Sequence, residues 1–366
     1  MANCVRYKSA IHCLTYNHSQ FIEKAMNGFC EQKTQFPFIC ILIDDASTDD
    51  SQKIILKYLN DFFEIDNNEI YNRESTDDYD LYFSRHKTNN NCYFAFYLLK
   101  YNYYSINKSK IDLFTRWDDK VDYIAICEGD DYWIDSAKLQ KQCVFLENHS
   151  NYSMVCNRTV LFSQKEGRFV GENYCYLRSR DITVKDMIYR TGLFVSTCSI
   201  VYRREVCENK PDYWRFCAVG DYPLQIACVM KGKCWYMNEA MSVYRINNPS
   251  SWMGNQNWSG GGCDPKRKIV IESRIRMFKG FALDYPQYNK LLNNKIADEI
   301  NRNIPGRDSG ISSVYKHLLL FSDEIKKYSL RWKLDLFFRK SRIPYVRGLY
   351  TRLFMRSYCH KVLHYR

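Results

Sequence analysis

Two adjacent carboxylates, Asp130 and Asp131, follow the apolar run Tyr123–Cys127 and precede Tyr132-Trp133. Adjacent carboxylates at the end of a strand repel each other, and this repulsion is costly unless a cation offsets it. Carboxylate oxygens are hard ligands that suit Mn²⁺ or Mg²⁺, and these ions keep coordination positions open for phosphate oxygens. The pair therefore predicts a divalent metal site. The alternative is a solvated turn before a helix that Asp135 caps.

Two other apolar runs also end in polar residues. Thr15-Tyr16-Asn17 closes a run that begins at Ala10, and Asp44-Asp45 follows the run Phe38–Ile43. A carboxylate after the second run can accept a hydrogen bond from the imide N–H of a base such as uracil. Capping of the following helix is the alternative for the same residues. Backbone and hydroxyl groups of the first tripeptide could contact the base.

The first half of the chain alternates strand-like and helix-like segments, and these segments must position the polar residues. Apolar spacing predicts helices after Ser19, after Ser47 and between Ser136 and Glu147, and a further helix over Phe94–Tyr104. Residues 66–80 are predicted as a loop, and Leu81–Phe83 as a short strand. This order predicts a mostly parallel sheet with helices on both faces. Ligands bind beyond the carboxyl ends of such strands, so the three polar ends should form one site.

The second half of the chain is more mixed. Strands are predicted over the ranges Ser153–Phe162, Thr197–Tyr202, Lys233–Met237 and Ser242–Ile246. A short helix follows Asp181-Ile182-Thr183, and another opens at Gly220-Asp221 and runs through Met230. From about residue 266 onward the pattern is helical.

Three blocks closely resemble the signature blocks of family 2 glycosyltransferases. They are Leu14–His18, Ile43–Ser51 and Cys127–Trp133, and Lys138–Gln142 resembles the helix that follows in bacterial members. The resemblance covers residues 8–250. It implies the GT-A fold, with a Rossmann-like, mostly parallel central sheet flanked by helices. It also implies metal-dependent, inverting transfer of a sugar from a nucleotide sugar, with UDP as the expected nucleotide.

The resemblance assigns roles to individual residues. Thr15 and Asp45 resemble the nucleoside contacts, Asp130 the residue beside the ribose and diphosphate, and Asp131 the ligand of Mn²⁺ or Mg²⁺. Asp221 resembles the catalytic base. A helix N-terminus keeps such a carboxylate ionised, and simple capping of the helix is the alternative. The predicted nucleotide-sugar-binding residues are together Thr15, Tyr16, Asn17, Asp44, Asp45 and Asp130.

Tyr244-Arg245-Ile246-Asn247 is similar to a family block in which a His stands two positions after the Arg. Asn247 occupies that position here, which weakens the case for a histidine metal ligand. Arg245 could contact a phosphate, and a structural salt bridge is the alternative. The loop region 66–92 contains Arg73, Arg85, His86 and Asn89. The resemblance suggests that this region approaches the base or the diphosphate, and solvated side chains are the alternative.

The net charge of +12 is concentrated at the end of the chain. Residues 313–366 contain 13 Lys+Arg and 3 Asp+Glu, a balance of +10, so the remaining residues carry only +2. This distribution argues against nucleic-acid binding. Basic residues with interleaved aromatics suit an anionic membrane surface. Packing of this region on the catalytic domain is the alternative.

The expected organisation is a catalytic domain over residues 1–260 and a helical, basic region over 261–366. Residues 1–135 would bind the nucleotide sugar, and residues 136–260 a glycan or lipid-linked acceptor. The resemblance suggests surface-polysaccharide biosynthesis, such as capsule or O-antigen. No apolar run is long enough to span a bilayer and no signal peptide is evident, so the expected location is cytoplasmic, peripheral on the inner face of the membrane. The 16 cysteines lack zinc spacing and are expected to be buried thiols.

Two other functions compete with glycosyl transfer. A nucleotidyltransferase usually has a glycine-rich phosphate loop after the first strand, and Thr15-Tyr16-Asn17-His18 contains no glycine. A non-catalytic, membrane-associated binding module would be expected to have lost an acidic residue, yet Asp45, Asp130, Asp131 and Asp221 are all present. The sequence does not name the sugar, the acceptor, the linkage or the oligomeric state.

Overall fold

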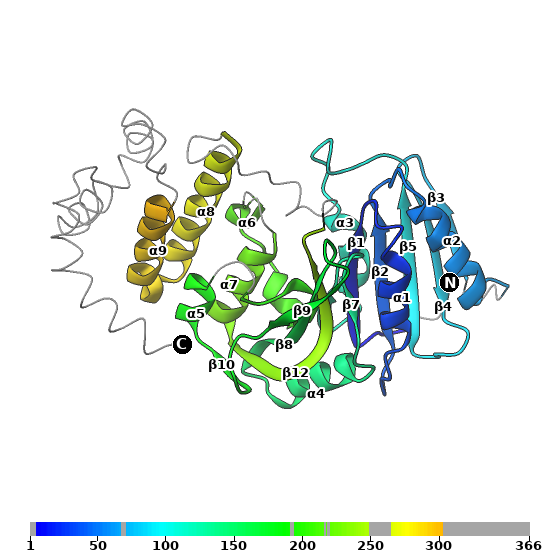
Figure 1. Cartoon of the computed structure of the whole chain (residues 1–366), viewed down its shortest axis with the longest axis horizontal. Helices are drawn as coiled ribbons and strands as arrows, with labels where there is room; N and C mark the ends of the chain where they lie inside the picture. Colours follow the sequence, from blue (N-terminus) through cyan, green and yellow to red (C-terminus); the bar gives the residue numbers. More distant parts are fainter. Residues whose placement is uncertain are drawn as a thin grey trace. The chain divides into compact units, whose positions relative to one another are not determined.

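The computed structural model describes residues 5–66, 71–190, 194–215, 217, 220–248 and 265–302. The chain divides into two compact units, one formed by residues 1–210 with 221–256 and the other by 211–220 with 257–366. The first unit contains the sheet and the candidate site (Figure 1). The described part of the second unit is helical: α6 (Asp212–Arg215), α8 (Pro265–Asp284) and α9 (Asn289–Arg302). The predicted basic region 313–366 lies outside the described residues.

The sheet of the first unit has 12 strands and is mixed. Its parallel core has the order β6–β1–β2–β5. The strands of this core are β1 (Ser9–Thr15), β2 (Phe38–Asp44), β5 (Cys92–Leu99) and β6 (Tyr123–Ile126). β11 (Val201–Arg203) runs antiparallel to both β6 and β8 and so joins the core to a second parallel pair, β8 (Tyr152–Ser163) and β12 (Lys233–Ile246).

Shorter strands and helices complete the first unit. The remaining strands are β3 (Asn72–Ser75), β4 (Tyr79–Arg85), β7 (Tyr132–Trp133), β9 (Arg168–Asn173) and β10 (Arg180–Ile182). The helices are α1 (Ile22–Cys30), α2 (Ser51–Phe62), α3 (Ile111–Asp118), α4 (Lys138–Asn148), α5 (Val184–Tyr189) and α7 (Asp221–Lys231).

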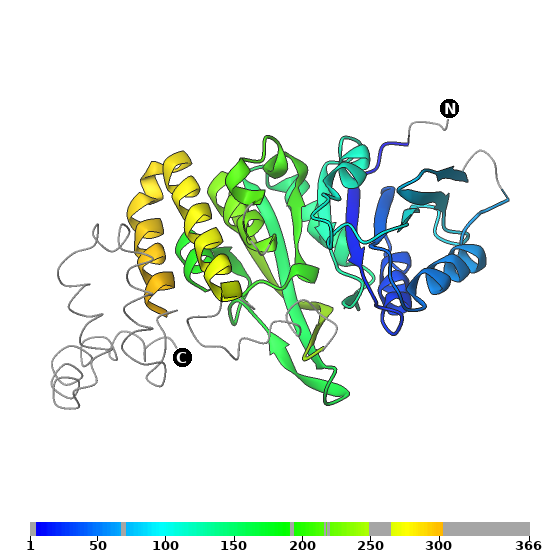
Figure 2. The same ribbon diagram turned by 90° about the horizontal axis from the view of Figure 1, so that it is seen from above.

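Helices cover both faces of the parallel core, as β1 shows residue by residue. Ile11 and Cys13 belong to the same buried cluster as Ile22 and Phe29 of α1. His12, which points to the other face, stacks on Phe114 of α3 with ring centroids 4.0 Å apart. The alternation of side chains along a strand produces this division. Figure 2 shows α1 and α2 on one face of these strands and α3 on the other.

The prediction of a helix over Phe94–Tyr104 is wrong. Residues Cys92–Leu99 form β5, which is buried along nearly its whole length between β2 and β4. A strand buried on both faces loses the alternation of apolar and polar residues, so periodicity alone did not identify it. Its run of aromatic residues is typical of strands. The predicted loop over 66–80 also contains β3, which pairs with β4.

The second half differs from the predicted strands in two places. The two strands expected at Lys233–Met237 and Ser242–Ile246 are one strand, β12, whose register against β8 shifts between Met237 and Ser242. The strand expected at Thr197–Tyr202 begins as a 3₁₀ turn, Thr197–Ser199, and only then becomes β11. Predicted helices after Thr183 and from Asp221 are present as α5 and α7.

The described helices include none that is both long and apolar enough to cross a membrane. The thirteen cysteines among the described residues are free thiols, and all except Cys207 are buried.

Candidate active site

The three polar strand ends meet at one edge of the sheet, called here the carboxyl edge. Thr15, at the end of β1, is in register with Asp44, at the end of β2. On the other side of β1, the Gly129 N–H donates to the Leu14 carbonyl oxygen at 2.8 Å. The prediction that these segments share one edge is therefore confirmed.

Gly129 is required by the close approach of two backbones. A Cβ atom at this position would lie 2.7 Å from Thr15 Oγ1 and 2.8 Å from Thr15 Cβ. Both distances are too short for any side chain, and the atoms involved belong to a short, buried residue. Glycine thus allows the segment after β6 to lie against the end of β1. Asp130 and Asp131 follow directly in this segment.

Asp131 is buried and is held by the backbone of β12. Its Oδ1 accepts the Arg245 N–H at 2.8 Å, and the residue is 3% exposed. Burial, followed by the nearby negative charge of Asp130, raises the pKa of Asp131 well above its ordinary value, although the Arg245 N–H opposes this shift. The protein alone therefore does not compensate this carboxylate, which is the situation that a bound cation resolves.

Arg245, on β12, contacts the segment that contains Asp130 and Asp131 and holds it in place. Its Nη1 donates to the Asp130 carbonyl oxygen at 2.7 Å. Its guanidinium carbon lies 4.8 Å from the ring centres of both Phe21 and Tyr132. The guanidinium thus contacts a carbonyl and two aromatic faces. It forms no salt bridge with any residue that the structure describes, so the alternative role of Arg245 in a structural salt bridge is not supported.

Three buried polar atoms around Asp130 have no hydrogen-bond partner among the described residues: Thr15 Oγ1, His18 Nδ1 and Arg245 Nε. The Nε2 atom of His18 lies 3.9 Å from Asp130 Oδ2. Each buried polar atom left without a partner costs about 1–3 kcal/mol. Three at one place indicate a site where a ligand supplies the missing partners.

His18 and Asn248 are site residues to which the sequence alone gave no role. His18 stands directly after the predicted tripeptide, and Asn248 Nδ2 lies 3.5 Å from Asp130 Oδ2. The only sequence signal was their position, because His18 closes one resemblance block and Asn248 follows another.

Two of the predicted nucleotide-sugar residues hold the loops of the site together. Asp44 accepts hydrogen bonds from the Ser47 N–H at 2.9 Å and from Gln52 Nε2 at 2.8 Å. Asn17, which has a positive φ of 56°, accepts from the Thr48 N–H at 2.8 Å. The Asn17 side chain thus links the loop after β1 to the loop after β2, and the Asp44 side chain holds the end of β2 to that second loop and to α2.

Both oxygens of the Asp45 carboxylate have partners within the protein. Its Oδ1 accepts the Tyr103 N–H at 2.7 Å, and its Oδ2 lies 2.7 Å from Lys110 Nζ. Asp45 therefore anchors the segment between β5 and α3 in this structure. Tyr16, by contrast, is 41% exposed.

Asp221 is the first residue of α7, as predicted. Its Oδ2 accepts from Thr197 Oγ1 at 3.2 Å and from Gln225 Nε2 at 3.4 Å. Asp221 also acts on Glu128: desolvation of the Glu128 carboxyl, followed by the negative charges of Asp130 and Asp221, raises its pKa. The side chain of Glu128 is exposed, so water screens much of this effect.

The donor set suits a hard divalent cation. The described residues contain no cluster of three or more His, Cys, Asp or Glu side chains arranged around a metal position. The hard oxygen donors at this edge are Asp131, the predicted metal ligand, and the adjacent Asp130. Mg²⁺ and Mn²⁺ are commonly bound in this way, through one or two carboxylates together with substrate phosphates.

Residues 11–77, which include the ends of β1 and β2, match the family model described as Glycosyl transferase family 2. This part of the chain is therefore similar to family 2 glycosyltransferases. An uncharacterized protein of Mycobacterium tuberculosis is 27% identical over 243 residues, which are 66% of this chain and 60% of that protein. A Mycobacterium bovis protein, also uncharacterized, gives the same values. The chain thus spans 60% of the length of these curated relatives.

Solved structures show the fold of this chain. Staphylococcus aureus TarS, residues 1–349 in complex with UDP, aligns with a TM-score of 0.56 and 15% identity, over 93% of this chain and 87% of that chain. This likeness shows a GT-A-type fold with a mixed sheet, parallel core strands and flanking helices. A mannosyltransferase from Pyrobaculum calidifontis, solved with GDP-Man and Mn²⁺, is more distant, with a TM-score of 0.47, 11% identity and coverage of 90% and 79%.

Proposed function

We propose that this domain transfers a sugar from a UDP-sugar to a hydroxyl of a glycan or lipid-linked acceptor, with inversion at the anomeric carbon, in surface-polysaccharide biosynthesis. The observation that carries the proposal is the meeting of Asp130 and Asp131 with unpartnered buried polar atoms at the carboxyl edge. Their chemistry suits a nucleoside diphosphate bound through a cation. The choice of UDP is supported by the similar TarS structure, which was solved in complex with UDP.

Asp131 and Asp130 would hold Mn²⁺ or Mg²⁺, which when bound offsets the negative charge that develops on the departing diphosphate. Arg245 is fixed by its Nη1 bond to the Asp130 carbonyl, while its Nε has no partner among the described residues. This fixed guanidinium can donate Nε–H to a phosphate oxygen. His18 Nδ1 lies at the same place and can take part in the same contact or bind the ribose.

Asp221 would act as the base. Thr197 and Gln225 hold its Oδ2, so the carboxylate has a fixed direction. The N-terminus of α7 favours its ionised form. In the proposed reaction, the acceptor oxygen attacks the anomeric carbon, its proton passes to Asp221, and the bond from the sugar to the diphosphate breaks.

Tyr16 and Thr15 are the proposed contacts to the nucleoside, through an exposed ring and an unpartnered hydroxyl. Asp45 would reach the base only if it exchanged one of its present partners, Tyr103 N–H or Lys110, for the imide N–H. Asp44 and Asn17 would act indirectly, by fixing the loops that carry the other residues.

Thermal unfolding of the full chain with UDP, GDP or ADP, with and without Mn²⁺, tests the donor class. We expect UDP to raise the midpoint only when Mn²⁺ is present, because the cation joins the diphosphate to the two carboxylates. Asp131→Asn should abolish this shift. Asp50→Asn, at an exposed carboxylate paired with Lys53, should leave it unchanged. Equal stabilisation by UDP with and without Mn²⁺, or none by any nucleotide, would refute the proposal.

Membrane association through residues 313–366 and a peripheral cytoplasmic location remain predictions from the sequence. Flotation of the full chain with vesicles of anionic or zwitterionic lipid tests them. Binding to anionic vesicles that is lost at high salt is the expected result.

A further inference from the structure

The turn that holds the proposed base is itself held by two buried side chains from other elements. Thr197, whose hydroxyl donates to Asp221 Oδ2 at 3.2 Å, is the first residue of the 3₁₀ turn Thr197–Ser199. The other two residues of this turn, Cys198 and Ser199, are fully buried. Their carbonyl oxygens each accept a hydrogen bond from a side chain outside the turn.

Trp133 makes the first of these bonds. Its Nε1 donates to the Cys198 carbonyl oxygen at 3.0 Å, and Trp133 stands only two residues after Asp131. Helix α1 fixes this side chain: the Phe29 ring packs edge-on against it with centroids 5.0 Å apart. A Cβ atom on Gly28 would lie 2.8 Å from the Trp133 carbonyl oxygen, so glycine allows this close approach. Trp133 therefore joins the acidic segment to the turn.

Gln142 makes the second bond, from α4. Its Nε2 donates to the Ser199 carbonyl oxygen at 3.0 Å, and its Oε1 accepts from Lys138 Nζ at 2.6 Å. Because an ammonium group can only donate, this contact fixes which end of the Gln142 amide faces the turn. Lys138 Nζ also lies 4.2 Å from the centre of the Trp133 ring. One buried ammonium thus contacts both side chains that hold the turn.

We infer that Trp133, Gln142 and Lys138 are positioning residues: they fix the 3₁₀ turn and, through its first hydroxyl, the direction of the proposed base. The inference rests on the proposed role of Asp221 as that base. Each of the three side chains belongs to a residue that is 3% exposed or less, so they act from beneath the site without touching the donor or the acceptor. Displacement of a reacting group by about 1 Å can lower a rate on the order of 100-fold.

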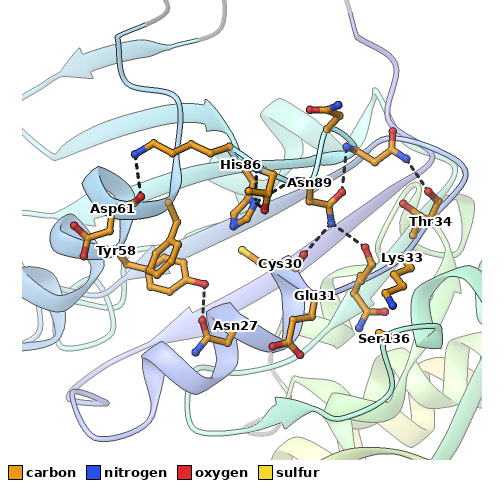
Figure 3. Close-up of a pocket in the computed structure, with 16 residues that line it drawn as sticks. Asn27, Cys30, Glu31, Lys33, Thr34, Tyr58, Asp61, His86, Asn89 and Ser136 are labelled. Carbon is orange, nitrogen blue, oxygen red and sulfur yellow. Dashed lines mark hydrogen bonds between the residues drawn. The ribbon is translucent and has the colours of Figure 1, made fainter.

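A similar arrangement at the opposite edge of the parallel core, where β2 and β5 begin, does not reach the carboxyl edge. A hollow of about 860 Å³ lies there, and Figure 3 shows Asn89 and His86 among its lining residues. Asn89 Nδ2 donates to the carbonyl oxygens of Cys30 and Gln32 at 2.8 and 2.9 Å. The sequence-based suggestion that His86 and Asn89 approach the nucleobase or diphosphate is therefore wrong. Asn89 instead provides a control, because its amide also holds backbone carbonyls.

Two variants of the full chain remove the bonds to the turn. Trp133→Phe keeps an aromatic ring but loses the Nε1 donor, and Gln142→Glu keeps an acceptor for Lys138 but loses the Nε2 donor. Each should lower kcat for transfer from a UDP-sugar about tenfold or more. KM for the UDP-sugar and the Mn²⁺-dependent stabilisation by UDP should stay at the wild-type values, because only the base is displaced.

Two control variants remove comparable bonds elsewhere. Trp117→Phe loses a buried indole bond to the Tyr97 hydroxyl of 2.9 Å, and Asn89→Asp loses its two bonds to backbone carbonyls. Both should lower the midpoint of thermal unfolding, as the two test variants do, but keep the wild-type kcat. Equal losses of kcat in the control and test variants would indicate general loosening of the fold and would overturn the inference.

The Thr197 hydroxyl is the proposed link, so its removal should make the positioning contacts irrelevant. Thr197→Val removes this hydroxyl and Thr197→Ser keeps it. In the Thr197→Val background, Trp133→Phe should lower kcat less than about twofold, whereas in the Thr197→Ser background it should cause the full loss. The same loss in the wild-type and Thr197→Val backgrounds would contradict a path through this hydroxyl.

Asp221→Asn separates failure of this inference from failure of the proposed function. If the wild type transfers no sugar, or if Asp221→Asn keeps full turnover, the proposed base is wrong and the positioning role falls with it. If Asp221→Asn loses turnover while Trp133→Phe and Gln142→Glu keep the wild-type kcat, only the positioning role is refuted. Either of these two variants is sufficient for the test once circular dichroism shows that it is folded.

Discussion

The carboxyl edge of the parallel core and the opposite, amino edge, at which β2 and β5 begin, both gather buried polar groups, but these groups differ in how far they are paired. At the carboxyl edge, Asp131 is buried beside Asp130, and Thr15 Oγ1 and His18 Nδ1 have no partner among the described residues. At the amino edge, His86 Nδ1 accepts two N–H groups and Asn89 Nδ2 donates to two carbonyl oxygens, those of Cys30 and Gln32.

This difference separates a binding role from a structural one on the same scaffold. Uncompensated charge at the carboxyl edge favours a ligand that brings its own cation and phosphate groups. The paired groups at the amino edge instead hold the loop before β5 against the end of α1. α1 connects the two edges, since the turn before it begins at His18 and the helix ends at Cys30.

The largest effect is expected from Asp131→Asn. The variant keeps the shape and the Arg245 N–H acceptor but removes the buried charge, so sugar transfer should fall on the order of 10³-fold. Turnover of UDP-sugars at saturating Mn²⁺ measures this loss. Full transfer activity in the variant would remove Asp131 from the metal site.

Asp221→Asn should lower turnover about 10²–10³-fold, which is the usual range for the loss of a general base. Stabilisation by UDP with Mn²⁺ should persist, because Asp221 is bonded to Thr197 and Gln225 and is not one of the proposed metal ligands. Loss of turnover together with loss of nucleotide binding would instead assign Asp221 to donor binding. Asp131→Asn and Asp221→Asn together therefore separate the residues that bind the donor from the residue that accepts the proton.

The carboxyl edge could be predicted from the sequence because its elements are local. Each polar cluster follows directly after an apolar run, and the parallel order of those runs places the clusters together. What could not be predicted is how each carboxylate is paired. Asp45 was expected to be available to a base, but its partners come from residues 103–110, a segment that was expected to be helical in part.

The amino edge could not be predicted at all. Cys30, His86 and Asn89 line one hollow, and the loop that carries the latter two reaches the end of α1 because β5 lies beside β2. The error that assigned β5 as a helix also hid this neighbourhood. Buried aromatic strands give little periodic signal, so sites that depend on their pairing require the structure.

A buried ammonium gives a pH-dependent comparison within α4. Lys138 is fully buried, its Nζ donates to Gln142 Oε1 at 2.6 Å, and burial lowers its pKa to about 8 from 10.5. The unfolded chain therefore binds more protons between pH 8 and 10.5. The contribution of Lys138 to the free energy of unfolding should rise over this window by about 3 kcal/mol.

Denaturant titrations of Lys138→Met and the wild type at pH 8 and pH 10 measure this difference. The variant should lack the rise that Lys138 contributes, so its stability relative to the wild type should be greater at pH 8 than at pH 10. Lys141→Met, on the exposed side of the same helix, should keep the wild-type pH dependence. Identical pH dependence in Lys138→Met and the wild type would show that the pKa of this ammonium is not lowered by folding.

The smallest expected effect is the most selective test of the carboxyl edge. Thr15→Val replaces an unpartnered buried hydroxyl with a methyl group, so the free energy of unfolding should stay the same or rise by less than about 1 kcal/mol. If the hydroxyl binds the donor, KM for the UDP-sugar should rise several-fold with little change in kcat.

Thr159→Val is the matched control, since Thr159 Oγ1 is paired with Ser196 Oγ at 2.8 Å. That variant should lose about 1 kcal/mol of stability and keep the wild-type KM. The two variants should therefore give opposite results: Thr15→Val should change KM but not lower the stability, and Thr159→Val should lower the stability but not change KM.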